Sequence, residues 1–409
     1  MQKRWGTEAH YHITTPGTDE FYFSAGQWSP DGTCLLTLDS SRTVRLFNTP
    51  ASLFDAAADP GPRDAALVLT RADPIYAAAW PPGMRSADPE SCVFALATRD
   101  HPLLLIDAYT GLVRGKYTAL ADGDMTTAPH SLAFSPDGTT LYGGMENKIA
   151  VFDINIQGNN PLSYLNTTPT RKSMYGQKGL LSHLSTSPFH PTLLLASSYS
   201  KSFAVYDTTC GESVALISGI PGTGVTQAEF SAADASLILV ASRRSNVIQA
   251  YDARNLADGA PLFELPRPGN TNQRIAFSQS PDGKLLVTGD SNGNVLVYDL
   301  VEASRSSASS KGNDGNMTDI GDTTTNTVLI NATKISDEAV ASAVVHPYYY
   351  PDSESGKTTY WMAAVTGERR QLSIPGSNYQ DSDSDMETDH VETRGTGVSA
   401  EINMFQITK

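Results

Sequence analysis

The sequence predicts an all-β fold, a single seven-bladed β-propeller that spans residues 1–409. Three observations predict it. A phrase centred on Ser-Pro-Asp-Gly returns along the chain, weaker copies fill the intervals between the clear ones, and each copy closes on an apolar-x-aromatic run. Seven copies of a β-rich unit of roughly 40–50 residues are typical of a propeller, because each blade buries its faces against its neighbours. One domain is therefore expected, although the length alone suggests two or three.

The three clear copies of the unit begin at Trp28, Phe134 and Ser278. They read WSPDGTCLLTLDSSRTVRLFN, FSPDGTTLYGGMENKIAVFD and SQSPDGKLLVTGDSNGNVLVYD. In each copy a strand leads into a Pro-Asp-Gly turn, in which Pro presets φ at the first turn position and Gly tolerates a positive φ. A second strand, a short polar loop and a third strand follow. The unit is that of WD-repeat propellers, with Phe-Asp or Tyr-Asp in place of Trp-Asp.

Four weaker copies complete the set of seven, and the third strand of the last one is expected at Glu401–Ile407. The third strands should end at Phe47, Ile106, Phe152, Tyr206, Tyr251, Tyr298 and Phe405. A propeller must also close into a ring. We expect the N-terminal segment Ala9–Thr14 to supply the outer strand of the blade that ends at the C-terminus.

Two segments interrupt the repeat. Residues 304–327 contain almost no apolar side chains, and they are predicted to form a disordered insertion after the sixth blade. Residues 377–397 are strongly acidic, and they are predicted to form a disordered insertion within the last blade. We interpret the second segment as a solvated spacer, with a regulated loop as the alternative.

Composition and motifs argue against several functions. The formal net charge of −15 argues against a protein that binds nucleic acid over its whole surface, although it allows a local basic face. The three cysteines show no metal or redox spacing, and the eight histidines form no HExxH-type motif. No GxSxG, P-loop or dinucleotide motif occurs, and no apolar segment suits a signal peptide or a membrane span. We therefore expect no enzyme, no metal, no cofactor, no small-molecule substrate and no membrane partner.

A candidate site follows from the topology. In a propeller, the loops between second and third strands share one face with the connectors that enter each new blade. These segments are rich in basic and amide side chains, and residues 165–275 hold nine Lys and Arg against seven Asp and Glu. Such a face can contact phosphates and the edges of unpaired bases. The predicted RNA-binding residues are Gln177, Lys178, Arg243, Arg244, Asn272, Gln273 and Arg274.

A structural role for the same residues is the alternative. Asn272 and Gln273 would then bond neighbouring backbone groups at the mouth of the central channel, because polar groups there need partners. Arg274 would pair with an acid such as Asp290. The face would serve a protein partner instead of RNA.

Three phrases resemble the telomerase Cajal body WD-repeat protein family. The residues 100–144 read DHPLLLIDAYTGLVRGKYTALADGDMTTAPHSLAFSPDGTTLYGG, residues 175–188 read YGQKGLLSHLSTSP, and residues 271–275 read TNQRI. The resemblance extends over residues 20–300 and is weaker in the last blade. The chain lacks the long N-terminal extension of animal members.

The resemblance implies a nuclear scaffold that binds small nuclear or Cajal-body-type RNAs, including telomerase RNA, and fungal relatives are linked to splicing. Expected partners are small non-coding RNA and ribonucleoprotein proteins, with a monomeric propeller inside a larger complex. The expected localisation is the nucleus, with the cytoplasm as an additional site. The alternative function is a protein-binding propeller that has no direct RNA contact.

Overall fold

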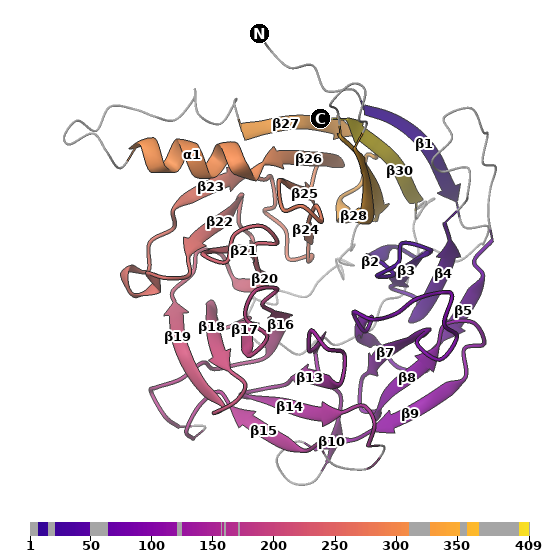
Figure 1. The fold of residues 1–409 in the computed structure, drawn as a ribbon, viewed down its shortest axis with the longest axis vertical. Helices are drawn as coiled ribbons and strands as arrows, with labels where there is room; N and C mark the ends of the chain where they lie inside the picture. The colour runs from indigo at the N-terminus through magenta and orange to yellow at the C-terminus, as the bar shows by residue number, and fades with distance from the viewer. Residues whose placement is uncertain are drawn as a thin grey trace, which may run out of the picture.

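The structure, a computed structural model, describes residues 7–14, 21–49, 64–120, 125–156, 158, 161–170, 172–310, 328–351, 358–367 and 401–408. Seven four-stranded antiparallel sheets stand as blades around a ring, in chain order (Figure 1). The predicted seven-bladed WD-repeat β-propeller is therefore confirmed. None of the described helices is long and apolar enough to cross a membrane.

The blades follow one another with few irregularities. Blade one holds β2 (Phe23–Trp28), β3 (Cys34–Asp39), β4 (Thr43–Asn48) and β5 (Leu67–Thr70). Blade two holds β6 (Ile75–Ala79), β7 (Val93–Thr98), β8 (Leu103–Asp107) and β9 (Val113–Tyr117). Blade three holds β12 (Ser131–Phe134), β13 (Thr140–Gly144), β14 (Lys148–Asp153) and β15 (Ser163–Asn166). A short pair, β10 (Ala119–Leu120) and β11 (Thr126–Thr127), precedes blade three.

The remaining blades repeat the pattern. Blade four holds β16 (Leu181–Thr186), β17 (Leu193–Ser198), β18 (Ser202–Asp207) and β19 (Glu212–Ser218). Blade five holds β20 (Gly224–Phe230), β21 (Leu237–Arg243), β22 (Val247–Asp252), a 3-10 turn (Leu256–Asp258) and β23 (Phe263–Pro266). Blade six holds β24 (Phe277–Gln279), β25 (Leu285–Gly289), β26 (Asn294–Asp299), the helix α1 (Leu300–Ser310) and β27 (Leu329–Lys334). Blade seven holds β28 (Val340–Pro351), β29 (Thr358–Thr366), β30 (Glu401–Thr408) and β1 (Thr7–Thr14).

The predicted third strands are β4, β8, β14, β18, β22, β26 and β30, and each contains the aromatic or aliphatic end residue that the sequence indicates. These end residues are buried because they pack between blades. Tyr206 of blade four is 1% exposed and lies in one apolar cluster with Tyr142 and Ile149 of blade three. The repeat is thus a packing unit: its apolar positions make the interface with the next blade.

The Pro-Asp-Gly turns hold the first and second strands of a blade together. In blade one, Asp31 accepts hydrogen bonds from Ser29 Oγ at 2.8 Å and from the backbone N–H of Thr33 at 3.2 Å. Gly32 has φ +65°, a conformation that glycine adopts at little cost. The turns at residues 135–139 and 280–284 repeat the same bonds.

The ring closes through both ends of the chain. β1 pairs antiparallel with β30, and Thr7 lies opposite Ile407 while Thr14 lies opposite Glu401. In Figure 1 β1 lies outside β30 at the rim, next to blade one. The expected outer strand from the N-terminal segment is confirmed, and it begins two residues earlier than Ala9.

The start of the segment 304–327, which was expected to be disordered, is helical in the structure. Its first residues, 304–310, belong to α1, so the expectation of disorder is wrong there. Asp299 caps the helix, because its Oδ1 accepts the backbone N–H groups of Val301 at 3.0 Å and Glu302 at 3.1 Å. Leu300 and Ala303 anchor the helix in the core against Val328. Residues 311–327 and the acidic segment 377–397 lie outside the described residues.

Candidate nucleic-acid interface

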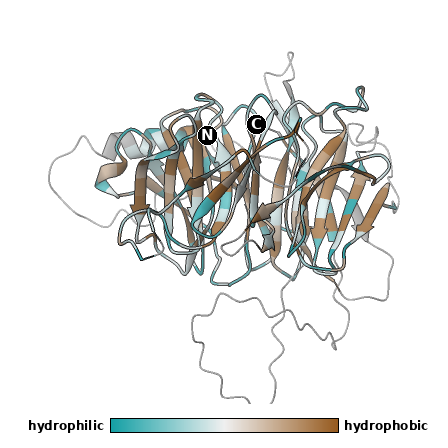
Figure 2. Cartoon of the chain, turned by 90° about the horizontal axis from the view of Figure 1, so that it is seen from below, coloured by the Kyte–Doolittle hydropathy of each residue, from teal (hydrophilic) through white to brown (hydrophobic). Residues whose placement is uncertain are grey.

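The two faces of the disc are built from different loops. The upper face consists of the loops between second and third strands and of the connectors that enter the next blade. The lower face consists of the Pro-Asp-Gly turns and of the loops that follow the third strands. In the side view of Figure 2, the apolar strands stand between hydrophilic loops on both faces. Backbone bonds join the upper loops to neighbouring connectors, as between Arg244 N–H and Thr271 O at 3.1 Å.

The upper loops share an unusual backbone feature. In five successive blades, the turn before the third strand contains a residue with positive φ that is not glycine. These residues are Arg42 (64°), Asp100 (56°), Asn147 (59°), Lys201 (58°) and Arg244 (49°). In blade six, Gly293 occupies the equivalent place with φ 83°. A side chain in this conformation costs about 1 kcal/mol relative to glycine, so these turns retain side chains against a local preference.

Three side chains meet where blades four, five and six adjoin. The guanidinium carbon of Arg243 lies 4.2 Å from the ring centroid of Tyr199, which is a cation–π contact. Arg243 and Arg274 are both partly buried, and the Nε atom of Arg243 is buried without a hydrogen-bond partner. Burial lowers the pKa of Arg274, and its electrostatic neighbours are Tyr199, Arg243 and Glu229. An arginine stays charged at neutral pH even so.

Most of the positive charge around Tyr199, Arg243 and Arg274 is not neutralised by ion pairs. Lys178, Lys201 and Arg244 are exposed. Among the residues that the structure describes, no ion pair involves these three cations, Arg243 or Arg274. We call these five residues the cationic cluster. It differs from the corresponding region of blade two, where Arg99 lies 3.9 Å from both Asp73 and Asp100.

Two of the predicted site residues lie inside the protein. Gln177 is 1% exposed, and its side-chain amide donates to Ala196 O at 2.9 Å and accepts from Tyr206 Oη at 3.1 Å. Gln273 is 8% exposed, and its Nε2 donates to Gly367 O at 2.7 Å. Neither side chain presents a free amide to a ligand on the surface. Gln273 makes a backbone contact of the kind that the structural alternative describes, and Gln177, which that alternative does not include, makes one as well.

The remaining predicted residues lie at the upper face. Lys178, Arg243, Arg244 and Arg274 belong to the cationic cluster, and Asn272 lies beside them, partly buried. Arg274 does not have Asp290 as its partner. That carboxylate is 1% exposed and holds its own turn, because it accepts the backbone N–H groups of residues 292 and 294 at 2.9 and 2.7 Å.

Sequence reasoning misplaces one cation and leaves others out of the predicted site. Arg267 lies on an entry connector, where a surface charge is expected, but it is 2% exposed and donates to Ile275 O at 3.0 Å and Ser242 O at 3.3 Å. Lys201 is not among the predicted contacts, although it lies, like Arg244, in the turn before the third strand of its blade. Tyr175, on the connector before blade four, is 82% exposed and offers a free aromatic face close in sequence to Lys178.

The inner wall of the channel carries a second polar group below the cluster. Glu229 accepts from Gln227 Nε2 at 2.7 Å, and its Oε1 lies 3.9 Å from His183 Nε2. Burial raises the pKa of Glu229 and lowers the pKa of His183 to about 3. The described residues contain no group of three His, Cys, Asp or Glu side chains that could hold a metal ion.

Comparisons with known proteins agree with this architecture. The WD domain, G-beta repeat family matches residues 261–299, which include β23 to β26. Telomerase Cajal body protein 1 of Bos taurus is 34% identical over 289 residues, which are 70% of this chain and 51% of that protein. The protein of the same name from Homo sapiens is 33% identical over 282 residues, 68% of this chain and 50% of that protein. The chain belongs to the WD-repeat proteins, as a relative of the telomerase Cajal body proteins.

A fungal relative completes the comparison. Guanine nucleotide-binding protein negative regulator 1 of Schizosaccharomyces pombe is 29% identical over 292 residues, 69% of this chain and 72% of that protein. This WD-repeat chain spans about half the length of its mammalian relatives.

Proposed function

We propose that the protein is a nuclear WD-repeat scaffold that binds small non-coding RNA of the nuclear or Cajal-body type through its upper face. One observation carries the proposal: five cations of blades four to six gather there without ion-pair partners among the described residues. Unpaired cations are what a phosphate backbone requires. The names of the relatives, which refer to telomerase and to Cajal bodies, support a ribonucleoprotein and a nuclear context.

The cluster suits single-stranded RNA better than a duplex. Arg243 lies over the ring of Tyr199, and Tyr175 is 82% exposed. Flat aromatic and guanidinium groups stack on unpaired bases, at about 1–3 kcal/mol for each base. The exposed ammonium and guanidinium groups of Lys178, Lys201 and Arg244 would contact phosphates on either side.

Equivalent positions in the repeat supply a matched test. Lys201 and Arg42 occupy the same place in the turns of blades four and one, because each directly precedes the third strand, with φ 58° and 64°. Replacing either by Ala changes the backbone equally, but only Lys201 belongs to the cationic cluster. With a fluorescein-labelled RNA hairpin that carries an unpaired loop, we expect K201A/R244A to weaken binding about tenfold. The salt slope should fall by about 0.7 for each phosphate that the variant no longer neutralises.

Two results would contradict the proposal. An R42A variant that loses as much affinity as K201A would mean that charge alone, and not the cluster, attracts RNA. Unchanged affinity of the folded double variant at moderate salt would favour the alternative, a scaffold that binds only proteins. Crosslinking and sequencing of RNA bound to the tagged protein in cells, with the double variant beside it, would then identify the RNA.

A further inference from the structure

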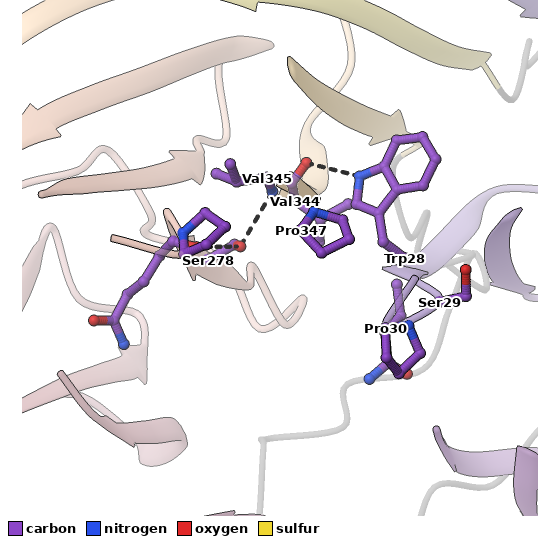
Figure 3. A pocket seen from close by; sticks show the side chains of 10 residues that line it. Trp28, Ser29, Pro30, Ser278, Val344, Val345 and Pro347 are labelled. Carbon is purple, nitrogen blue, oxygen red and sulfur yellow. Dashed lines mark hydrogen bonds between the residues drawn. The ribbon is translucent and has the colours of Figure 1, made fainter. Parts of the chain in front are cut away.

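A hollow of about 350 Å³ lies on the lower face between blades six, seven and one (Figure 3). Two hydrogen bonds between blades join its walls, from Trp28 Nε1 to Val344 O at 3.3 Å and from the Val345 N–H to Ser278 Oγ at 3.2 Å. All ten residues that line it are neutral. The hollow therefore gives no charge by which an occupant could be selected, in contrast to a basic loop on the upper face.

This loop lies in the connector that enters blade four, and its two ends are joined. The Gln177 N–H donates to Thr167 O at 2.8 Å, and Thr167 Oγ1 donates to Gln177 O at 2.7 Å. Gly176 has φ 93°, and a Cβ atom there would lie 2.4 Å from Thr167 O, so the closed base requires glycine. Residues 168–176, which we call the entry loop, therefore leave the upper face and return to it at one fixed point.

The tip of the entry loop is exposed and contains a tight turn. The Ser173 N–H donates to Thr170 O at 2.9 Å, and Ser173 Oγ accepts the Tyr175 N–H at 3.0 Å. Met174 is 91% exposed and Tyr175 is 82% exposed. Among the described residues, no hydrogen bond uses the hydroxyl proton of Ser173. This hydroxyl group is therefore available to an enzyme that docks on the loop.

The residues around Ser173 have a charge pattern that suits a protein kinase. Arg171 and Lys172 precede Ser173 directly, and the apolar Met174 follows it. Arg171 lies outside the described residues and contributes only through its place in the sequence. Kinases choose among serines partly by the charges beside them, and an acidic groove on the kinase holds basic residues of this kind. The entry loop thus combines an accessible hydroxyl group with a charge pattern for its recognition.

A second serine has the same charge pattern but is closed to a kinase. Arg243 and Arg244 directly precede Ser245, and no other serine of the sequence follows two basic residues. Ser245 is only 9% exposed, and its Oγ donates to Val247 O at 3.1 Å. A kinase that depends on the charge pattern alone would modify both serines. One that acts on the folded chain should modify the serine of the entry loop.

We propose that Ser173 is a phosphorylation site for a kinase that recognises the basic residues before it. Ser173 Oγ attacks the γ-phosphorus of ATP, so that an Oγ–P bond forms while the bond from this phosphorus to the bridging oxygen breaks and ADP leaves. The hydroxyl proton passes to the catalytic carboxylate of the kinase. The phosphoserine carries a charge of about −1.5 to −2 at pH 7.

The place of Ser173 gives this modification a consequence for the cationic cluster. Lys178 follows the closed base directly, and Ser198 Oγ donates to Lys178 O at 2.5 Å, so the base lies against the turn that carries Lys201. Ser173 is four residues from Gln177, a span of at most about 14 Å. A phosphate there repels an RNA backbone on the cluster and competes with it for Lys178. This consequence rests on the proposed function, whereas the modification itself does not.

Mapping of phosphorylated residues by mass spectrometry tests the site. The folded full chain is incubated with ATP and a panel of purified kinases that require basic residues before serine. We expect Ser173 to be phosphorylated at least tenfold more than Ser245, and Lys172→Glu to reduce the reaction at Ser173 about tenfold. Synthetic peptides of the sequences 167–179 and 239–251, which lack the fold, should react about equally. An unmodified Ser173 with every kinase, or equal reaction of Ser173 and Ser245 in the folded chain, would overturn the proposal.

RNA titration of the modified protein tests the consequence. With the labelled hairpin described above, we expect phosphorylation of Ser173 to weaken binding about threefold at roughly 50 mM salt. The difference should disappear near 0.5 M salt, because salt screens charges at this separation. Ser173→Ala treated with the same kinase is the control and should bind like the untreated protein. Equal affinity of the phosphorylated and unmodified chains would overturn the consequence. A hairpin that binds neither form would contradict the proposed function and leave the phosphorylation site intact.

Discussion

His130 lies at the start of the innermost strand of blade three, and its imidazole stacks on the ring of Tyr76. The two centroids are 4.1 Å apart with 21° between the planes. Burial lowers the pKa of His130 to about 4, because a charged imidazolium loses its hydration there. The ring is therefore neutral at physiological pH and serves the packing between blades two and three.

Acid should weaken the fold through this residue. An unfolded His titrates near 6.5, so the unfolded chain binds more protons than the folded one between pH 6.5 and 4. The contribution of His130 to the free energy of unfolding is therefore greatest above pH 6.5. It falls by roughly 2–3 kcal/mol as the pH drops from 6.5 to 4. His130→Phe keeps the stacking and cannot titrate. Urea denaturation at pH 7, 5.5 and 4.5 should show a shallower loss in H130F, and parallel losses would refute this assignment.

Single side chains also show what the sequence can and cannot reveal. Lys178 and Arg244 are exposed at the upper face, as expected, because long charged side chains at turns rarely enter a core. The amides of Gln177 and Gln273 are buried, and the sequence does not show this, since a polar residue beside a channel can face water or bond a backbone carbonyl. Arg267 is an exception among the charged residues, because Ser242 O of blade five and Ile275 O on the connector to blade six compensate its burial. Local sequence does not show where such acceptors lie.

At the scale of elements, the turns of the upper face repeat one backbone shape with different side chains. The left-handed residue directly precedes the third strand in blades one, three, four and six, where it is Arg42, Asn147, Lys201 and Gly293. A Cβ atom on Gly293 would lie 1.9 Å from Ser336 O, so this turn has no room for a side chain. Elsewhere in the ring, larger residues keep the same conformation.

Exchanging these residues should separate stability from function. Lys201→Gly relieves the left-handed strain and adds freedom to the unfolded chain, and these effects of about 1 kcal/mol each oppose one another. We expect an unchanged free energy of unfolding together with weaker RNA binding. Gly293→Ala, in contrast, should destabilise by at least about 2 kcal/mol, because strain and overlap add. Urea denaturation and RNA titration of both variants measure this, and a destabilised K201G would contradict it.

The elements themselves were largely predictable. Phe47, Tyr206 and Phe405 marked third strands because an apolar-x-aromatic run packs between blades wherever it recurs. The helix α1 was missed, since its sequence LVEASRSSASS has few apolar residues. Among the helix side chains that the structure describes, only Leu300 and Ala303 reach the core, and the cap at Asp299 starts the helix. Two apolar contacts are too weak a pattern to recognise without the neighbouring strands.

For the molecule as a whole, ring closure and charge separation are the two defining features. The acidic total of −15 conceals a cationic cluster on the upper face. Closure depends on pairing between β1 and β30, whose residues are almost a full chain length apart. The repeat predicted this closure, because seven units without a joint between the ends would leave two exposed edges.

Removing or relocating β1 should test how much ring closure contributes to the free energy of unfolding. Removing residues 1–14 exposes the edge of β30, and we expect a loss of at least about 3 kcal/mol in unfolding free energy and a tendency to aggregate. Thr7 lies opposite Ile407, so a short hairpin can join the ends. Residues 7–14 placed after Lys409 through Asn-Gly should restore the stability. A truncated chain that is as stable as the full chain, together with a permutant that gains no stability, would show that β1 is dispensable.

The pairing between β1 and β30 also sets an order of events during synthesis. The strand that completes the ring is the first to leave the ribosome, and its partner is the last. At about 5–20 residues per second, β1 waits roughly 20–80 s for β30. During that interval the nascent chain carries a strand whose hydrogen-bonding groups lack their final partner. A premature stop codon anywhere upstream of β30 therefore leaves β1 without its partner strand, however many blades have already formed.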